Sequence, residues 1–102
     1  MTRRIRLQSR AALDLRDHFL YLARQDSRVA TRFGDAIDDS FQRLLENPDL
    51  GFEGELTQPR LQDVRCWPVR GFSQHVIYYR STVEGIEVMR VMHGSRDAEQ
   101  LL

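Results

Sequence analysis

Apolar residues follow two different periods along the chain, and the change of period divides it into a helical part and a strand-rich part. A period of three to four residues, typical of amphipathic helices, extends over residues 9–26 and 28–46. The apolar stripes are Ala12, Leu15, Phe19 and Leu22 in the first segment and Val29, Ala30, Phe33, Ile37, Phe41, Leu44 and Leu45 in the second. Ser9 and Ser27 are the expected N-caps. Because only residues 25–27 separate the two helices, the sequence predicts an antiparallel helical hairpin.

Strand-like patterns precede and follow this hairpin. Residues 3–7 are predicted to form a short first strand, and residues 64–69, 74–80 and 86–93 are rich in β-branched and aromatic side chains. Residues 47–62 hold two prolines and two glycines without periodicity, so a loop is expected there. The predicted order is strand, helix, helix and three strands. This order favours an α+β fold in a single domain over residues 1–102, with the hairpin packed on one face of a small, mainly antiparallel sheet.

Arginine supplies every basic residue in this chain of 102 residues, and fifteen arginines balance fifteen acidic residues. The lack of lysine excludes a Schiff-base lysine, a P-loop lysine and a lysine general base. The zero formal net charge argues against a polybasic protein that coats nucleic acid or a membrane surface. Cys66 is the single cysteine, so no intramolecular disulfide and no cysteine-rich zinc site is available.

No apolar run approaches the roughly 18 residues of a membrane span. Residues 1–10 are also too polar for a secretory signal. A cytoplasmic protein that does not contact membranes is therefore expected, and nothing in the sequence calls for a cofactor.

The arginines are unevenly distributed. Residues 1–10 carry four arginines and no acid, whereas residues 11–63 are acidic in sum. In the strand-rich part Arg65, Arg70, Arg80, Arg90 and Arg96 are interleaved with Trp67, Phe72, Tyr78 and Tyr79. Such a surface can bind phosphate and stack the bases of RNA. The favoured alternative is that the aromatic residues pack within the sheet while the arginines protect its edges from aggregation.

Histidine and cysteine offer little support for catalysis or metal binding. His18 is expected to be a surface residue of the first helix. His75 and His93 lie on strands that are expected to be neighbours, so their side chains can approach each other. No further ligand has a supporting spacing, so no metal site is predicted. Cys66 is expected to be a buried, unreactive thiol.

Small, apolar and aromatic residues recur in a characteristic order through nearly the whole chain. They are Ala12, Asp14, Leu15, Tyr21, Ala30, Phe33, Leu44, Pro48, Gly51, Arg65, Trp67, Val69, Gly71, Phe72, Val76, Ile77 and Tyr78, followed by RVMHGSRD over residues 90–97. On these residues the chain resembles the ParE branch of the RelE/ParE superfamily. Its members, some called plasmid stabilisation proteins, are toxins of bacterial type II toxin–antitoxin modules.

The resemblance implies a strand, a helical hairpin and a β-meander, in agreement with the periodicity. It also implies a protein partner, a ParD-like antitoxin whose disordered C-terminal segment folds onto the toxin and neutralises it in a hetero-oligomer. The implied target of the free toxin is DNA gyrase, which such toxins inhibit by binding. No catalytic residue and no direct contact with nucleic acid are then expected.

The RelE branch of the superfamily instead cleaves messenger RNA on the ribosome, and it supplies the main alternative. RelE-type ribonucleases carry strand lysines and an arginine that stabilise the phosphate during attack by the 2′-hydroxyl. In this chain the corresponding positions hold Cys66, Pro68 and His75, and only Arg96 matches. Because loss of several cooperating groups lowers a rate by many orders of magnitude, RelE-like cleavage is disfavoured. An inactive toxin homologue is the third possibility.

Two sets of residues follow as candidates for binding. The target-binding candidates are Arg65, Trp67, Arg90, His93 and Arg96, with Trp67 as a packing anchor. The antitoxin-binding candidates are Leu15, Phe19, Phe33, Ile37 and Phe41 on the apolar surface of the hairpin, together with an exposed sheet edge. Strict strand alternation places Arg90 and His93 on opposite faces, so one common patch requires a bulge or a turn between them.

Overall fold

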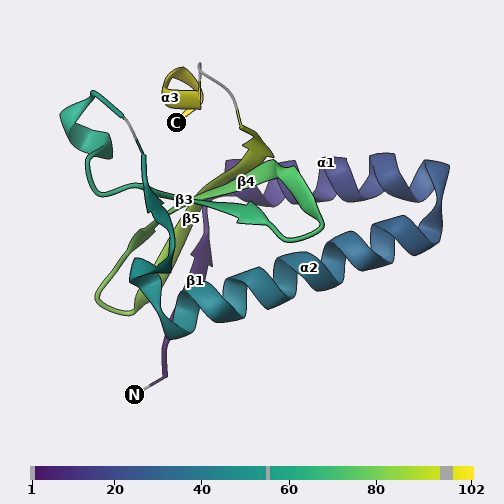
Figure 1. The fold of residues 1–102 in the computed structure, drawn as a ribbon, viewed down its shortest axis with the longest axis horizontal. Coiled ribbons are helices and arrows are strands. Elements are labelled where there is room, and N and C mark those ends of the chain that lie inside the picture. Colours follow the sequence, from purple (N-terminus) through teal and green to yellow (C-terminus); the bar gives the residue numbers. More distant parts are fainter. Residues whose placement is uncertain (1, 55, 95–97) are drawn as a thin grey trace.

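The computed structural model describes residues 2–54, 56–94 and 98–102, which are arranged as shown in Figure 1. The long elements are β1 (Arg4–Leu7), α1 (Ser9–Gln25), α2 (Ser27–Glu46), β3 (Arg65–Val69), β4 (Phe72–Ser81) and β5 (Gly85–His93), followed by the short helix α3 (Ala98–Leu101). The predicted α+β fold with its helical hairpin is confirmed. None of the helices in the described ranges is long and apolar enough to cross a bilayer.

The turn between α1 and α2 is fixed by an aspartate. Asp26 has extended backbone angles, and its carboxylate accepts the backbone N–H of Arg28 at 2.9 Å, so Asp26 is the N-cap of α2. The N-cap of α1 is Gln8, whose side chain makes no capping bond. The expectation that Ser9 and Ser27 act as caps is therefore wrong, because each serine is already the first helical residue.

The segment predicted as a plain loop contains short regular elements. Pro48–Leu50 and Pro59–Leu61 form single 3-10 turns, and β2 (Phe52–Glu53) pairs antiparallel with β3. A two-residue strand leaves no periodic signal in the sequence. It is held here by pairing with Arg65 and Cys66, which lie beyond the second turn.

The described strands form one sheet with the order β1-β5-β4-β3-β2. The three pairs among β2, β3, β4 and β5 are antiparallel, whereas β1 runs parallel to β5, so the sheet is mixed but mainly antiparallel. Gly85 lies where β5 meets β1, and a Cβ there would collide with the backbone oxygen of Arg4. Glycine is thus required at Gly85 for the close approach of the two strands.

The sheet is covered on both faces. The main core lies between the sheet and the hairpin, with Phe33, Leu44, Ile77, Tyr79 and Val88 among its buried residues. A second cluster consists of Leu61, Val64, Tyr78, Met89 and Ala98, and it lies on the opposite face beneath the second 3-10 turn and α3. The hairpin lies on one face, as predicted, and the cover on the other face was not predicted.

A bulge interrupts β5 opposite the middle of β4. Tyr78 pairs with Arg90 and Tyr79 pairs with Val88, so Met89 is an extra residue on β5. An added residue shifts the alternation of the side chains by one position. As a result, Val88 and Val91 both belong to the main core although they are three residues apart.

The tip of the hairpin projects beyond the sheet (Figure 1). Helix α2 buries six residues, but the only buried residue of α1 is Ala11. Leu13, Phe19, Leu20 and Tyr21 are consequently exposed apolar residues on α1, each with more than 40% of its surface accessible. An apolar surface of this kind is a common mark of a binding site.

Candidate functional site

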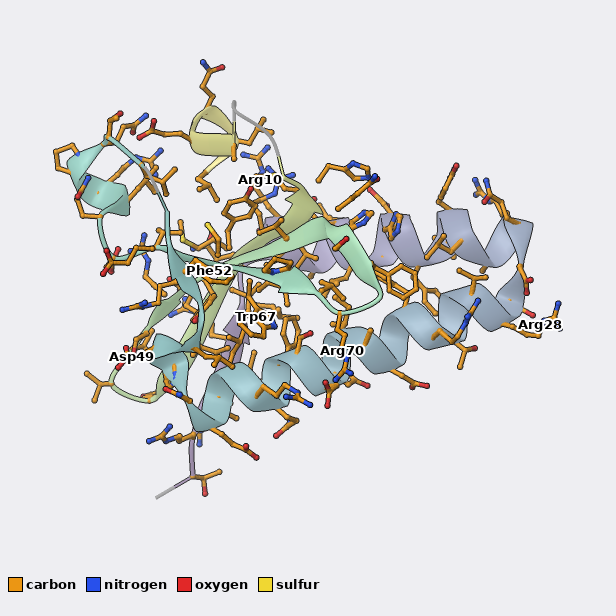
Figure 2. The ribbon with its side chains drawn as sticks, viewed as in Figure 1. Arg10, Arg28, Asp49, Phe52, Trp67 and Arg70 are labelled. Atoms are coloured by element: carbon orange, nitrogen blue, oxygen red, sulfur yellow. The ribbon has the colours of Figure 1, made fainter. Side chains whose placement is uncertain are left out.

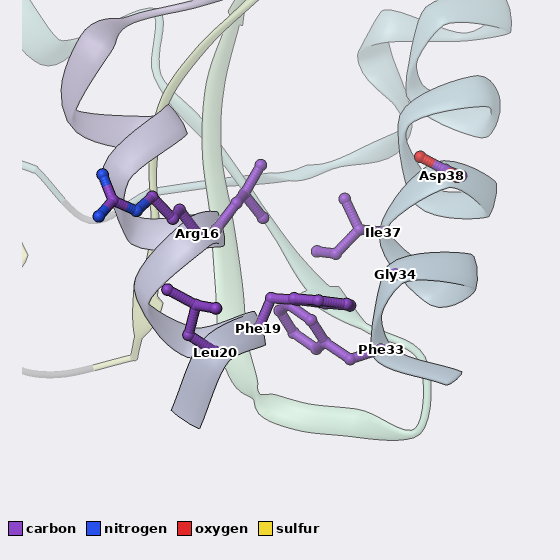
Figure 3. A pocket seen from close by; sticks show the side chains of 8 residues that line it. Arg16, Phe19, Leu20, Phe33, Gly34, Ile37 and Asp38 are labelled. Atoms are coloured by element: carbon purple, nitrogen blue, oxygen red, sulfur yellow. The ribbon is translucent and has the colours of Figure 1, made fainter. Parts of the chain in front are cut away.

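An apolar groove lies between α1 and α2, and Figure 3 shows it from close by. Its volume is about 320 Å³. The lining residues are Leu15, Arg16, Phe19, Leu20, Phe33, Gly34, Ile37 and Asp38. The side chains of Phe19 and Phe33 come from opposite helices, and both line the groove. Charged side chains stand only at its sides, with Arg16 on α1 and Asp38 on α2.

The floor of the groove is formed by a buried ring, and one wall is left open by a glycine. Phe33 is 1% exposed, and its ring lies edge-to-face with Phe72 at 5.2 Å and with His18 at 4.7 Å. A Cβ built on Gly34 meets nothing within 4 Å. Glycine in the middle of a helix destabilises it by about 0.5–1 kcal/mol relative to alanine. At Gly34 it leaves the wall of the groove free of a side chain.

Four of the five antitoxin-binding candidates line this groove: Leu15, Phe19, Phe33 and Ile37. Phe41 does not. It is 7% exposed and packs in the main core one turn further along α2. The sequence stripe missed Leu20, which is 41% exposed and lies beside the stripe rather than in it. On the α1 side, the groove is therefore lined by more residues than the apolar stripe of the sequence includes.

Arg90 is committed to an internal ion pair. Its Nε and Nη2 donate to the Asp14 carboxylate at 2.7 and 2.8 Å, and its Nη1 donates to the carbonyl of Leu101 at 3.1 Å. Asp14 also accepts the backbone N–H of Val91 at 3.1 Å. The hydrogen bonds from Arg90 to Asp14 raise the pKa of the guanidinium above its ordinary value. Arg90 thus ties α1, β5 and α3 together.

Arg65 likewise serves the structure around β2. Its Nη1 donates to the carbonyl of Gly51 at 2.9 Å, and its Nη2 lies 3.8 Å from a carboxylate oxygen of Asp49. Next to it, the hydroxyl of Tyr79 donates to the carbonyl of Pro48 at 2.7 Å and accepts the N–H of Gly51 at 2.8 Å. Burial raises the pKa of Tyr79, so this hydroxyl stays protonated.

Trp67 forms an aromatic surface with a residue that the sequence analysis did not single out. Its ring stacks on Phe52 with centroids 6.2 Å apart and planes 22° from parallel, and Phe52 is 64% exposed. Figure 2 shows the two side chains on neighbouring strands. Cys66, between Arg65 and Trp67, is half-buried, and its burial raises the pKa of the thiol. The expectation that Cys66 is buried is therefore met only in part.

His93 belongs to a cluster of three imidazoles rather than to an arginine patch. The ring of His75 lies 3.8 Å from that of His18 and 4.4 Å from that of His93, measured between centroids. The expectation that β4 and β5 are neighbours is confirmed, since His75 and His93 are paired. The expected surface role of His18 is wrong, because its ring packs between these histidines and Phe33.

The described target-binding candidates are engaged in separate interactions. Arg65, Arg90 and His93 each contact a different set of neighbours, and Arg96 lies outside the described residues. Within the described ranges, no group of three histidine, cysteine or acidic residues is arranged to hold a metal ion. The groove on the hairpin is thus the best-defined candidate for binding.

The family model described as "ParE toxin of type II toxin-antitoxin system, parDE" matches residues 5–98, nearly the whole chain. The chain belongs to the ParE toxin family. A solved structure titled "Chromosomal ParDE TA system from P. aeruginosa" shares the fold with a TM-score of 0.72 over 92% of this chain and 98% of that one, at 15% identity. No curated protein matches the chain. The ParE resemblance inferred from the sequence is confirmed, and with it the fold of the ParE family.

Proposed function

We propose that this ParE-family chain is held by a ParD-like antitoxin in the hairpin groove and that the free chain inhibits DNA gyrase by binding it. The observation that carries the antitoxin site is the groove itself, an apolar concavity with Phe19 and Phe33 at its centre. An amphipathic helix recognises such a groove through apolar side chains spaced three or four residues apart. Arg16 and Asp38 offer charged partners on either side.

The neutral composition and the internal use of arginine support binding rather than RNA cleavage. Arg65 and Arg90 are engaged with Asp49, Gly51 and Asp14. Cys66 and Pro68 occupy positions where a RelE-type ribonuclease would carry lysine. Cleavage of RNA needs cations around the scissile phosphate and a base for the 2′-hydroxyl, so these residues supply little of what the reaction requires.

The groove is tested by filling it without disturbing the core. We expect Gly34→Trp to weaken binding of the antitoxin encoded by the adjacent gene at least tenfold, because the indole would occupy the open wall. Gly34→Ala is the matched control. It keeps the groove open and removes the destabilising glycine, so antitoxin affinity should stay unchanged. Equal affinity of both variants would place the antitoxin elsewhere on the molecule.

The function is tested by expressing the chain without its antitoxin. Growth should stop, a DNA-damage response should follow, and co-expression of the antitoxin should restore growth through a stable hetero-oligomer. Translation arrest with cleavage of mRNA in the ribosomal A site would instead identify the ribonuclease. Normal growth, together with antitoxin binding, would identify an inactive homologue.

A further inference from the structure

All three histidines of the chain meet at one place, although they come from three different elements. His18 lies on α1, His75 on β4 and His93 at the end of β5. Neighbouring rings in this histidine cluster are 3.8 and 4.4 Å apart. The cluster thus joins the middle of α1 to the ends of two strands of the sheet.

Among the described residues, none forms a hydrogen bond with the three imidazole rings. His75 is 8% exposed, His18 is half-buried and His93 is exposed. Two shallow cavities of about 420 and 320 Å³ open onto the three rings, so solvent protons can reach them. The cluster therefore combines tight ring contacts with access to water.

Few charged groups from the ranges 2–54, 56–94 and 98–102 face the cluster. From α1, Asp14, Asp17 and the phenol of Tyr21 line the smaller cavity together with the histidines. Asp14 is occupied by Arg90, and Asp17 forms no ion pair with another described residue. The other cavity is lined, besides the histidines, by residues 71–74 at the start of β4, which carry no charge. The ring of Phe33 closes the cluster on the α2 side.

These surroundings accept one proton more readily than two. A second imidazolium would face the first across a ring contact in a partly desolvated place. Burial and the neighbouring histidines lower the pKa of His75 from 6.5 to about 4, and burial followed by His93 lowers the pKa of His18. At neutral pH the buried ring of His75 is therefore uncharged.

We propose that the histidine cluster is a proton-sensitive junction between the helical hairpin and the sheet, which loosens when more than one of its imidazoles is protonated. The sign follows from linkage: the lowered pKa values of His18 and His75 mean that the unfolded chain binds protons at these two residues more tightly than the folded chain does. The stabilising contact of the neutral rings is complete above pH 6.5. It is lost as the pH falls towards 4.

The junction also touches the proposed antitoxin groove, and this consequence rests on the proposed function. Phe33 contacts His18 and His75 and lines the groove as well. Loosening of the junction should shift Phe33 and weaken antitoxin binding. The junction itself requires no partner, so it can be tested on the isolated chain whether or not the antitoxin binds in the groove.

The first experiment follows the Hε1 signals of the three histidines by NMR from pH 8 to pH 3.5. We expect His75 to titrate near pH 4 and His18 below 6.5. His93→Gln changes an exposed residue and should not unfold the protein. Because it removes a repelling charge, it should raise the pKa of both His18 and His75. Three independent titrations near 6.5, unaffected by His93→Gln, would overturn the proposal.

The second experiment compares the unfolding of the full chain with that of His75→Leu between pH 7 and pH 4. The difference between a pKa of 6.5 and one of about 4 corresponds to a change of up to about 300-fold in the folding equilibrium constant. Because His75 is only half protonated at pH 4, the wild type should lose roughly 100-fold relative to His75→Leu between pH 7 and pH 4. Hydrogen exchange of α1 should rise first. Parallel pH profiles, or uniform exchange across the hairpin, would contradict a junction at this place.

Discussion

The ion pair between Asp14 and Arg90 makes a strong prediction about stability. Asp14 accepts three hydrogen bonds, two from Arg90 and one from the N–H of Val91. The side chains of Asp14 and Arg90 are only 16% and 14% exposed. Asp14→Ala leaves a largely buried guanidinium without its counter-charge and the Val91 N–H without its acceptor. Breaking a buried pair in this way costs about 3–5 kcal/mol.

That loss is a large part of the total stability of a small domain, which is about 5–15 kcal/mol. The free energy of unfolding can be measured by urea titration with the fluorescence of Trp67, the only tryptophan. Asp17→Ala is the matched control, because it removes a carboxylate from the same helix that has no ion-pair partner among the described residues. The control should change the free energy of unfolding by less than about 0.5 kcal/mol.

A double variant separates the pair from the mere loss of a charge. Asp14→Leu combined with Arg90→Met replaces both partners by apolar groups, and it should recover most of the stability lost in Asp14→Ala. A cost below about 1 kcal/mol for Asp14→Ala would refute the structural role assigned to the pair. If Arg90→Met abolished toxicity without changing the free energy of unfolding, Arg90 would instead have a role in binding the target.

Three further substitutions test the packing that positions the groove and the sheet. Tyr79→Phe removes the hydroxyl that bridges Pro48 and Gly51, and it should lower the free energy of unfolding by about 1–3 kcal/mol. Gly85→Ala places a Cβ against the backbone oxygen of Arg4, so hydrogen exchange of β1 should rise more than that of β4. Phe33→Ala opens the floor of the groove and should cost about 3–5 kcal/mol in thermal or urea unfolding; a loss below 1 kcal/mol would show that Phe33 packs loosely.

The periodicity predicts the hairpin correctly because an amphipathic helix has an apolar residue every three or four positions on its buried face. The second covered face of the sheet was missed, although β5 carries a signal for it. Consecutive apolar residues in a strand indicate burial on both of its faces. β5 has two such pairs, Val88–Met89 and Val91–Met92. The covering residues, Leu61 and Ala98, come from segments without periodicity.

In the candidate site, too, local spacing predicts some residues, whereas others are brought together only by tertiary packing. The groove residues lie on the apolar stripes of two helices, Leu15 and Phe19 on α1 and Phe33 and Ile37 on α2, so they follow from local spacing. The pairing of Asp14 with Arg90 spans 76 positions and depends on how β5 lies against α1, which no local pattern specifies. The strand pattern predicts that His75 and His93 can approach each other, and the two residues are paired between β4 and β5. The contact of His18 with His75 depends on how α1 packs on the sheet, which the strand pattern does not specify.

A supercoiling assay with purified gyrase tests the proposed activity most directly. Added to relaxed plasmid, gyrase and ATP, the free chain should inhibit supercoiling in proportion to its concentration, and the cognate antitoxin should relieve the inhibition. Full supercoiling at saturating toxin, together with cleavage of mRNA on purified ribosomes by the same preparation, would contradict inhibition of gyrase by binding.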